Sequence, residues 1–266
     1  PVSEFATAVY GTAEQGLTLT LFDSWLGTVA FALQIYCDFS GYSDMATGIS
    51  RLLGFDLMRN FHFPYFSRNP SEFWNRWHIS LSSWFRDYVF FPLGGPYGSV
   101  FRWIRNVLIT FLVTGLWHGA AWNFVLWGLY HGILLVLHRL KESLRKSRKR
   151  RKDVIKKAAG ISSFFVLTSL GWILFRADSM GQALDILKTL ILDFGNLHFQ
   201  AKMPTEAAML GLPIFFVIEF LGNRSRGKRL DEVYPLPIWT AAYAAMAFLI
   251  LIGLSNVPAG FIYFVF

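Results

Sequence analysis

Six long apolar runs, separated by polar or basic segments, dominate the chain. They cover approximately residues 17–37, 104–118, 120–138, 158–175, 205–222 and 237–254. Most of them approach the roughly 20 residues that an α-helix needs to cross a bilayer. The first run ends in a polar stretch, Asp38–Asp44, before a weaker amphipathic run to Phe55. The pattern predicts an all-α fold, a polytopic transmembrane helical bundle in which residues 1–266 form one membrane-embedded domain.

A further helix is expected to begin at Asn69-Pro70-Ser71-Glu72. Asparagine caps helices well, proline suits the first turn, and glutamate here stands at the capping-box position. We expect this helix to continue to about Phe91. One face would carry the residues Trp74, Trp77, His78, Leu81, Trp84, Phe85 and Tyr88. Such an aromatic, amphipathic helix is typical of the membrane interface.

The runs on either side of Gly119 predict a helical hairpin. Its first arm, residues 104–118, would be roughly 22 Å long at 1.5 Å per residue, short of the roughly 30 Å hydrocarbon core. Basic residues flank both outer ends. We therefore expect a re-entrant hairpin with both ends cytoplasmic, whose tip, carrying His118, lies inside the membrane-embedded protein.

The charge distribution agrees with this topology. Segments 51–105, 139–157 and 223–229 hold 7, 11 and 4 Lys and Arg residues, or 22 of the 25 in the chain. All three segments fall on one side of the membrane if the hairpin is re-entrant, which is the positive-inside pattern. The net charge of +8 comes without any nucleic-acid-binding motif, so a nucleic-acid partner is excluded and the lipid bilayer is expected instead.

Composition supports a membrane location. Hydrophobic residues make up 54% of the chain and charged residues 16%, whereas soluble domains average about 45–50% and about 25%. The chain begins at Pro1 with no basic stretch before its first apolar run, so we expect no signal peptide. We expect instead an N-terminally truncated portion of a longer protein.

Two of the six histidines are candidates for catalysis. His118 lies in Thr114-Gly-Leu-Trp-His-Gly-Ala-Ala-Trp-Asn123, where an ionisable residue within the membrane by default suggests function. A neutral imidazole there suits general-base work, and a packed helix-pair histidine is the alternative. His78 either pairs with His118 or only orders its aromatic face. The candidates for substrate binding are Trp117, Trp122, Asn123, Trp74 and Asn75.

The other histidines suggest structural or exposed roles. His62 and His198 fall in loops, and His138 lies at a helix end beside basic residues. His131 lies in mid-span, which favours a hydrogen-bonded core histidine. No HExxH, CxxC, phosphate-binding loop, dinucleotide fingerprint or GxSxG motif is present. We therefore predict no metal and no bound cofactor.

These motifs resemble the membrane-bound O-acyltransferase (MBOAT) family. Within it they resemble the branch of bacterial alginate O-acetyltransferase membrane subunits and their D-alanine-transfer relatives. The resemblance rests on Gln34–Ala46, Asn60–Asp87 with its Phe-Trp-Asn-Arg-Trp-His-Ile-Ser-Leu motif, Leu116–Phe124 and Phe261–Phe264. Family members are longer, so this chain is expected to be their C-terminal portion.

The resemblance implies a helical bundle around a tunnel in a bacterial inner membrane. The donor, acetyl-CoA or another acyl thioester, would enter from the cytoplasm, and a polysaccharide or wall-polymer hydroxyl would approach from the other face. The family's essential histidine matches His118, which would act as general base without a covalent acyl-enzyme. Its second characteristic polar position matches His78. An extracytoplasmic acyltransferase partner protein is also implied.

Two other functions stay open from the residues alone. Asp38, Asp44 and Glu219 lie within or beside apolar runs and would suit a transporter or channel subunit, although for Glu219 a side chain bonded within the bundle is the favoured interpretation. The second alternative is a non-catalytic scaffold of a polysaccharide export complex.

Overall fold

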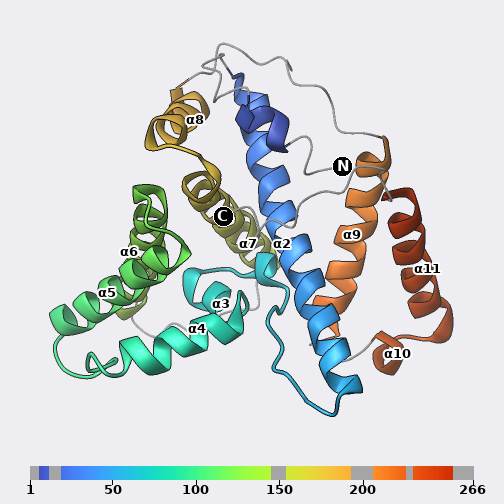
Figure 1. The fold of residues 1–266 in the computed structure, drawn as a ribbon, viewed down its shortest axis with the longest axis horizontal. Coiled ribbons are helices and arrows are strands. Elements are labelled where there is room, and N and C mark those ends of the chain that lie inside the picture. The colour runs from blue at the N-terminus through green and yellow to red at the C-terminus, as the bar shows by residue number, and fades with distance from the viewer. Residues whose placement is uncertain (1–5, 12–18, 145–153, 193–205, 226–229, 254–266) are drawn as a thin grey trace. The chain divides into compact units, whose positions relative to one another are not determined.

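The computed structural model describes residues 6–11, 19–144, 154–192, 206–225 and 230–253 (Figure 1). Regular secondary structure in these residues is entirely helical, which confirms the all-α prediction. Two compact units are found, Pro1–Phe39 with Asp193–Phe266, and Ser40–Leu192. The prediction of one domain over residues 1–266 stays a prediction. The Phe261–Phe264 motif, His198 and much of the basic segment 139–157 lie outside the described residues.

In the described part of the chain residues 6–11 are helical, and the later helical elements have the following bounds. They are α2 (Leu21–Leu52), the 3-10 helix η1 (Pro64–Phe66), α3 (Pro70–Trp74), α4 (Ile79–Phe85), the π-helix η2 (Arg86–Phe90), α5 (Val100–His118), α6 (Trp122–Leu144), α7 (Val154–Arg176), α8 (Met180–Leu192), α9 (Glu206–Arg224), α10 (Leu230–Val233) and α11 (Leu236–Gly253). Among the described residues, Val100–His118 and Ile155–Arg176 are long and apolar enough to cross a membrane. The larger number of crossings stays a prediction.

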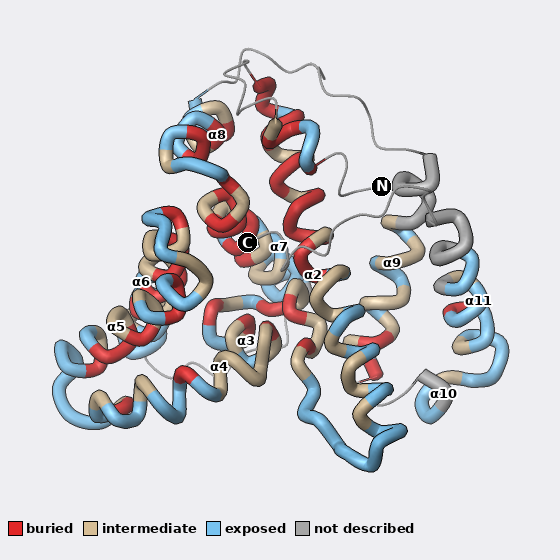
Figure 2. Tube along the Cα trace, in the orientation of Figure 1, coloured by how far each residue is buried: buried red, intermediate tan, exposed pale blue. Residues whose placement is uncertain are grey.

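Helix α2 is uninterrupted over 32 residues. The polar stretch Asp38–Asp44, in which the apolar run ends, therefore does not interrupt the helix. That stretch contains no proline, and the Thr47 hydroxyl donates to the Ser43 carbonyl at 2.8 Å, so its small polar side chains are accommodated within the helix. Burial changes along α2, from mostly buried before Tyr36 to half-buried or exposed beyond Ser40 (Figure 2).

In the unit that contains the chain's first residues, α2 and α9 are joined by a hydrogen bond. The Tyr36 hydroxyl donates to the Glu219 carboxylate at 2.9 Å. Glu219 is thus bonded within the bundle, one of the two explanations that the sequence left open. This contact accounts for an acidic residue in an apolar run without any need for a transported ion.

The hairpin in the unit Ser40–Leu192 is confirmed, with α5 and α6 joined by residues 119–121. The two helices touch through their backbones. A Cβ atom on Gly115 would overlap the carbonyl of Phe124, and one on Gly128 would overlap the carbonyl of Phe111. Small residues allow this approach, as they do between helices in membranes generally. The pairs 115 with 124 and 128 with 111 show that the two helices run antiparallel.

The first arm of the hairpin is longer than expected. Helix α5 begins at Val100, because the Ser99 hydroxyl accepts a hydrogen bond from the Arg102 amide at 3.3 Å and caps the helix. Its 19 residues span about 28 Å, close to the thickness of the hydrocarbon core. The length argument for a re-entrant hairpin is therefore wrong, and the depth of His118 in the membrane stays a prediction.

Helix α8 follows α7 through a capping box. The Ser179 hydroxyl accepts from the Gln182 amide at 3.1 Å, while the Gln182 side chain accepts from the Asp178 amide at 2.7 Å. This cap defines the start of α8. The residues that α8 buries are Gln182, Ala183, Ile186 and Leu190, whereas Leu184 and Ile191 are exposed.

Candidate active site

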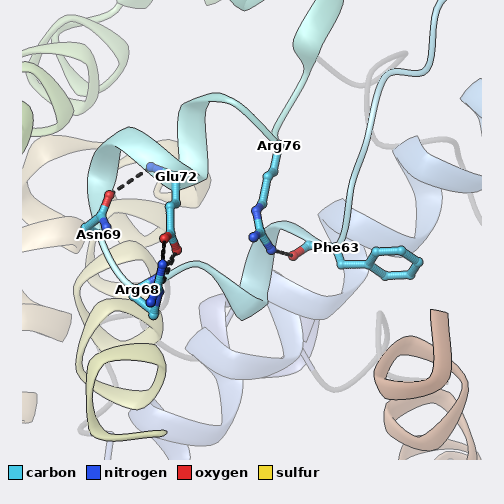
Figure 3. Close-up of polar contacts among 5 residues, drawn as sticks. All are labelled: Phe63, Arg68, Asn69, Glu72 and Arg76. Atoms are coloured by element: carbon cyan, nitrogen blue, oxygen red, sulfur yellow. Dashed lines mark hydrogen bonds and ion pairs between the residues drawn. The ribbon is translucent and has the colours of Figure 1, made fainter. Parts of the chain in front are cut away.

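The helix expected over residues 69–91 starts as the sequence indicates. The Asn69 side chain accepts from the Glu72 amide at 2.8 Å, and Pro70 occupies the first turn (Figure 3). The Glu72 carboxylate also accepts from the amide and guanidinium of Arg68. Burial raises the pKa of Glu72, but the hydrogen bonds from Arg68 outweigh it, so the net pKa is lowered. These contacts anchor α3 at its N-terminus.

The same helix then ends at Trp74, so the expectation of one continuous helix is wrong. Hydrogen bonds to the preceding loop stabilise the interruption between α3 and α4. The His62 amide donates to the Arg76 carbonyl at 2.9 Å, and the Ile79 amide donates to the Asn60 carbonyl at 2.9 Å. The Arg76 guanidinium also reaches the Phe63 carbonyl at 3.4 Å (Figure 3). Segment 60–63 therefore lies alongside 76–79 and takes backbone groups that a helix would use.

The break removes the expected aromatic face. Trp77 is buried, at 2% exposure, whereas Trp84 and Tyr88 are 51% and 68% exposed. The Trp77 ring stacks on Phe73 with centroids 5.5 Å apart and an interplanar angle of 13°. Residues before and after the break thus face different surroundings, because the helical register is lost between them.

His78 occupies the break itself. Its φ of 43° and ψ of 56° lie in the left-handed region, which costs a non-glycine residue about 1–3 kcal/mol. The Nδ1 atom lies 3.2 Å from Oδ1 of Asn60, and the imidazole stacks on Phe61 at 6.4 Å. Burial lowers the pKa of His78 to about 4. The side chain is therefore neutral near pH 7.

His118 ends α5 among aromatic rings from three helices. Its ring centroid lies 4.9 Å from Trp117, 5.1 Å from Trp127 and 5.1 Å from Phe175. The three interplanar angles lie between 79° and 88°, so each ring meets the imidazole edge to face. The side chain is half-buried. The two candidate catalytic residues interact electrostatically, so they lie near each other in the unit Ser40–Leu192.

Of the candidates for substrate binding, some are exposed near His118, whereas others make contacts that stabilise the fold. Trp117 is 56% exposed beside His118, and Trp122 is 75% exposed at the start of α6. Asn123 is buried, and its side-chain amide donates to the Ala177 carbonyl at 2.6 Å, which ties α6 to the end of α7. Trp74 packs on Trp127 and other core rings, and Asn75 is exposed. Their roles in binding stay predictions.

A cavity of about 420 Å³ lies between the α3–η2 segment and the α5–α6 hairpin. Its walls include Trp74 and Asn75, and five positions of α5, Trp103, Val107, Thr110, Phe111 and Thr114. Thr114 lies one helical turn before His118, so the cavity follows the face of α5 that leads to the candidate base. Charged or titratable groups in its wall are Arg86, His138, Arg139 and Glu142.

His131 is buried in the core, as expected, but the expectation of a hydrogen-bonded side chain is wrong. It has no exposed surface, and neither ring nitrogen has a hydrogen-bond partner among the described residues. The imidazole stacks on Phe73 at 6.1 Å and meets Trp74 at 5.2 Å, and its Nε2 points at Gly171. It serves as part of an aromatic core beside the site.

Three site residues escaped sequence analysis. Asn60, Trp127 and Phe175 stand 18, 9 and 57 positions from the histidines that they contact. Asn60 opens the segment that carries the family resemblance, but no spacing rule joins it to His78. In the part of the chain that the structure describes, no three His, Cys, Asp or Glu residues gather as metal ligands would.

Residues 1–171, which include His78 and His118, match the family model of MBOAT, the membrane-bound O-acyltransferase family. The chain belongs to the membrane-bound O-acyltransferase family. This membership confirms the resemblance drawn from the motifs. It also implies that the chain belongs to a membrane-bound protein.

Several bacterial acyltransferases are similar to the chain over between 45% and 85% of its length. A probable alginate O-acetylase AlgI of Pseudomonas aeruginosa is 38% identical over 231 residues, which cover 85% of this chain and 41% of that protein. A peptidoglycan O-acetyltransferase of Helicobacter pylori is 38% identical over 67% of this chain and 33% of its own length. A teichoic acid D-alanyltransferase of Bacillus subtilis is 36% identical over 45% and 32%. The chain thus spans about two fifths or less of the length of these relatives.

Proposed function

We propose that the protein is a membrane O-acyltransferase of the bacterial inner membrane, which moves an acyl group from a cytoplasmic thioester to a hydroxyl of an extracytoplasmic polysaccharide or wall polymer. The observation that carries this proposal is the position of His118. It ends α5 among three aromatic rings, one turn beyond the last α5 residue in the cavity wall. The names of the relatives, which act on alginate, peptidoglycan or teichoic acid, support the class of acceptor.

In the proposed reaction, His118 acts as general base. Its imidazole takes the proton of the acceptor hydroxyl as the oxygen attacks the thioester carbonyl. The carbon–sulfur bond then breaks, and the imidazolium returns the proton to the leaving thiolate, so that an ester and a free thiol are formed. Three aromatic rings pack edge to face around His118 within about 6 Å, and a ring that turns its face to the imidazolium would stabilise the charge formed in this step.

The cavity beside α5 is suited to the donor. Its wall has apolar residues for the acyl chain and hydroxyls at Ser82, Ser83, Thr110 and Thr114 for the amides of a pantetheine arm. Arg86 and Arg139 supply positive charge for a phosphate, although Arg86 also pairs with Asp87 and Glu142 lies in the same wall. A phosphate-bearing thioester such as acetyl-CoA, or an acyl group on a carrier protein, fits this distribution. Transfer to the polymer would be completed with an extracytoplasmic partner protein.

The test replaces His118 by alanine in the whole protein within its producing cells. The acyl content of the exported polymer, measured by mass spectrometry, should fall to that of a deletion strain while the amount of membrane protein is unchanged. His62→Gln is a matched control, since His62 is also half-buried in the same unit but has no place in the proposed reaction. Normal acylation by a stable His118→Ala protein would refute the proposal.

A further inference from the structure

Asn60 connects the His78 loop to two other parts of the unit Ser40–Leu192. Its side-chain Nδ2 donates to the Ser43 hydroxyl of α2 at 3.1 Å. Its Oδ1 accepts from the Ser80 hydroxyl at 2.9 Å and from the Ser80 backbone amide at 3.3 Å. The same Oδ1 lies 3.2 Å from Nδ1 of His78. One amide group therefore contacts the first turn of α4, the left-handed histidine and α2.

The orientation of the Asn60 amide follows from its partners. The backbone N–H of Ser80 can only donate, so the Asn60 atom that faces it must be the oxygen. A flipped amide would place two donors against each other there. The atom beside His78 is consequently an acceptor with no proton to give.

This arrangement fixes the proton on the imidazole. An unprotonated Nδ1 would set its lone pair against the Oδ1 lone pairs at 3.2 Å, whereas an Nδ1–H donates to them. The Ser80 hydroxyl is nearer to Asn60 Oδ1, at 2.9 Å, than to His78 Nδ1, at 3.3 Å, so its proton is directed to the amide. We infer that Asn60 is a positioning residue that holds His78 in the Nδ1–H tautomer, with the lone pair on Nε2.

This inference rests on the proposed acyltransferase function and assigns His78 a definite role in it. With the lone pair on Nε2, neutral His78 accepts a hydrogen bond and donates none from that atom. It therefore suits an O–H or amide N–H of a substrate, such as a neighbouring hydroxyl of the sugar or an amide of the donor's arm. The base, His118, stays a separate group. The strained backbone of His78 fits such a role, because left-handed residues persist where function requires a fixed side chain.

The tautomer can be observed directly. The whole protein, labelled with ¹⁵N-histidine and purified in detergent, gives ring-nitrogen signals that distinguish the two neutral tautomers by long-range ¹H–¹⁵N correlation near pH 7.5. The His78 signals are identified by their loss in His78→Gln. We expect an Nδ1–H imidazole in the native protein and a mixture of tautomers in Asn60→Leu. An Nε2–H imidazole in the native protein would overturn the inference.

Kinetics separate positioning from folding. Asn60→Leu should lower kcat/KM for acyl transfer by about 10- to 100-fold, the usual loss when the group that orients a histidine is removed. Asn60→Asp retains an acceptor oxygen and should recover much of the rate. Ser43→Ala removes only the bond to Nδ2 and should leave the rate near normal. The substrate whose KM rises in Asn60→Leu is the one that His78 contacts.

Two results would count against Asn60 while leaving the proposed function intact. One is a normal rate in Asn60→Leu, and the other is an equal loss in Ser43→Ala, which would indicate that the side chain only supports the fold. In both cases His118→Ala still abolishes transfer. If His118→Ala remains active, it is the acyltransferase proposal that fails, whatever the tautomer of His78.

Discussion

Replacing Gly128 by alanine should damage both stability and activity, because α5 and α6 touch through their backbones. A Cβ atom at this position would overlap the Phe111 carbonyl, a backbone atom that cannot rotate away. Ordinary contacts begin at about 3.4 Å, so the helices would have to separate by about 1 Å. Overpacking of this kind costs about 1–3 kcal/mol, which exceeds the gain of about 1 kcal/mol in helix propensity from glycine to alanine.

The consequence for the reaction should be larger than the loss of stability. His118 ends α5, and Trp127, next to Gly128, contacts its imidazole at 5.1 Å. A displacement of about 1 Å can lower a rate by about 100-fold. The assays are thermal unfolding of the purified whole protein and acylation of the polymer.

Gly48→Ala is the matched control for Gly128→Ala, since a Cβ at Gly48, near the C-terminal end of α2, meets nothing within 4 Å. It should be neutral or slightly stabilising. A Gly128→Ala protein as stable and active as the Gly48→Ala control would show that the close approach of α5 and α6 has been misjudged.

Three further predictions concern other parts of the site. Because burial lowers the pKa of His78 to about 4 from 6.5, the unfolded chain binds a proton between these values that the folded chain does not. The contribution of His78 to stability is therefore complete above pH 6.5 and is lost as the pH falls towards 4, by about 3 kcal/mol in total, and His78→Gln should flatten that part of a stability profile. Asn69→Ala should destabilise the protein by about 1 kcal/mol through loss of the α3 cap, whereas Asn69→Ser, which keeps a capping oxygen, should unfold near the native temperature. Trp127→Ala should lower the transfer rate more than Trp127→Phe does, since phenylalanine keeps a ring beside His118, and equal rates would contradict a role for that ring.

The parts of the fold that sequence could predict are those with local causes. Asn69 and Ser179 cap helices through contacts three residues away, and their side chains identify the starts of α3 and α8 without knowledge of the fold. The hairpin at Gly119 was likewise indicated by two apolar runs that are connected by small residues. Such signals depend only on neighbouring residues in the sequence, so they can be recognised without knowledge of the tertiary structure.

The break at His78 had no local cause. Trp74-Asn-Arg-Trp-His-Ile contains no proline or glycine, and its apolar spacing is compatible with a continuous helix. Segment 60–63 ends that helix by taking its backbone hydrogen bonds from a distance of about 16 residues. Asn60 was missed for the same reason, since its importance arises only once the loop has folded back.

The left-handed backbone at His78 bears on how this enzyme family can be engineered. Glycine, and to a lesser degree asparagine, adopt that conformation with less strain than histidine does. A screen that selects for thermal stability alone would therefore favour replacement of His78, and if His78 acts as proposed, the most stable variants would be poor catalysts. Selection for a more stable variant should therefore measure catalytic activity in every round, because stability and the proposed reaction favour different residues at position 78.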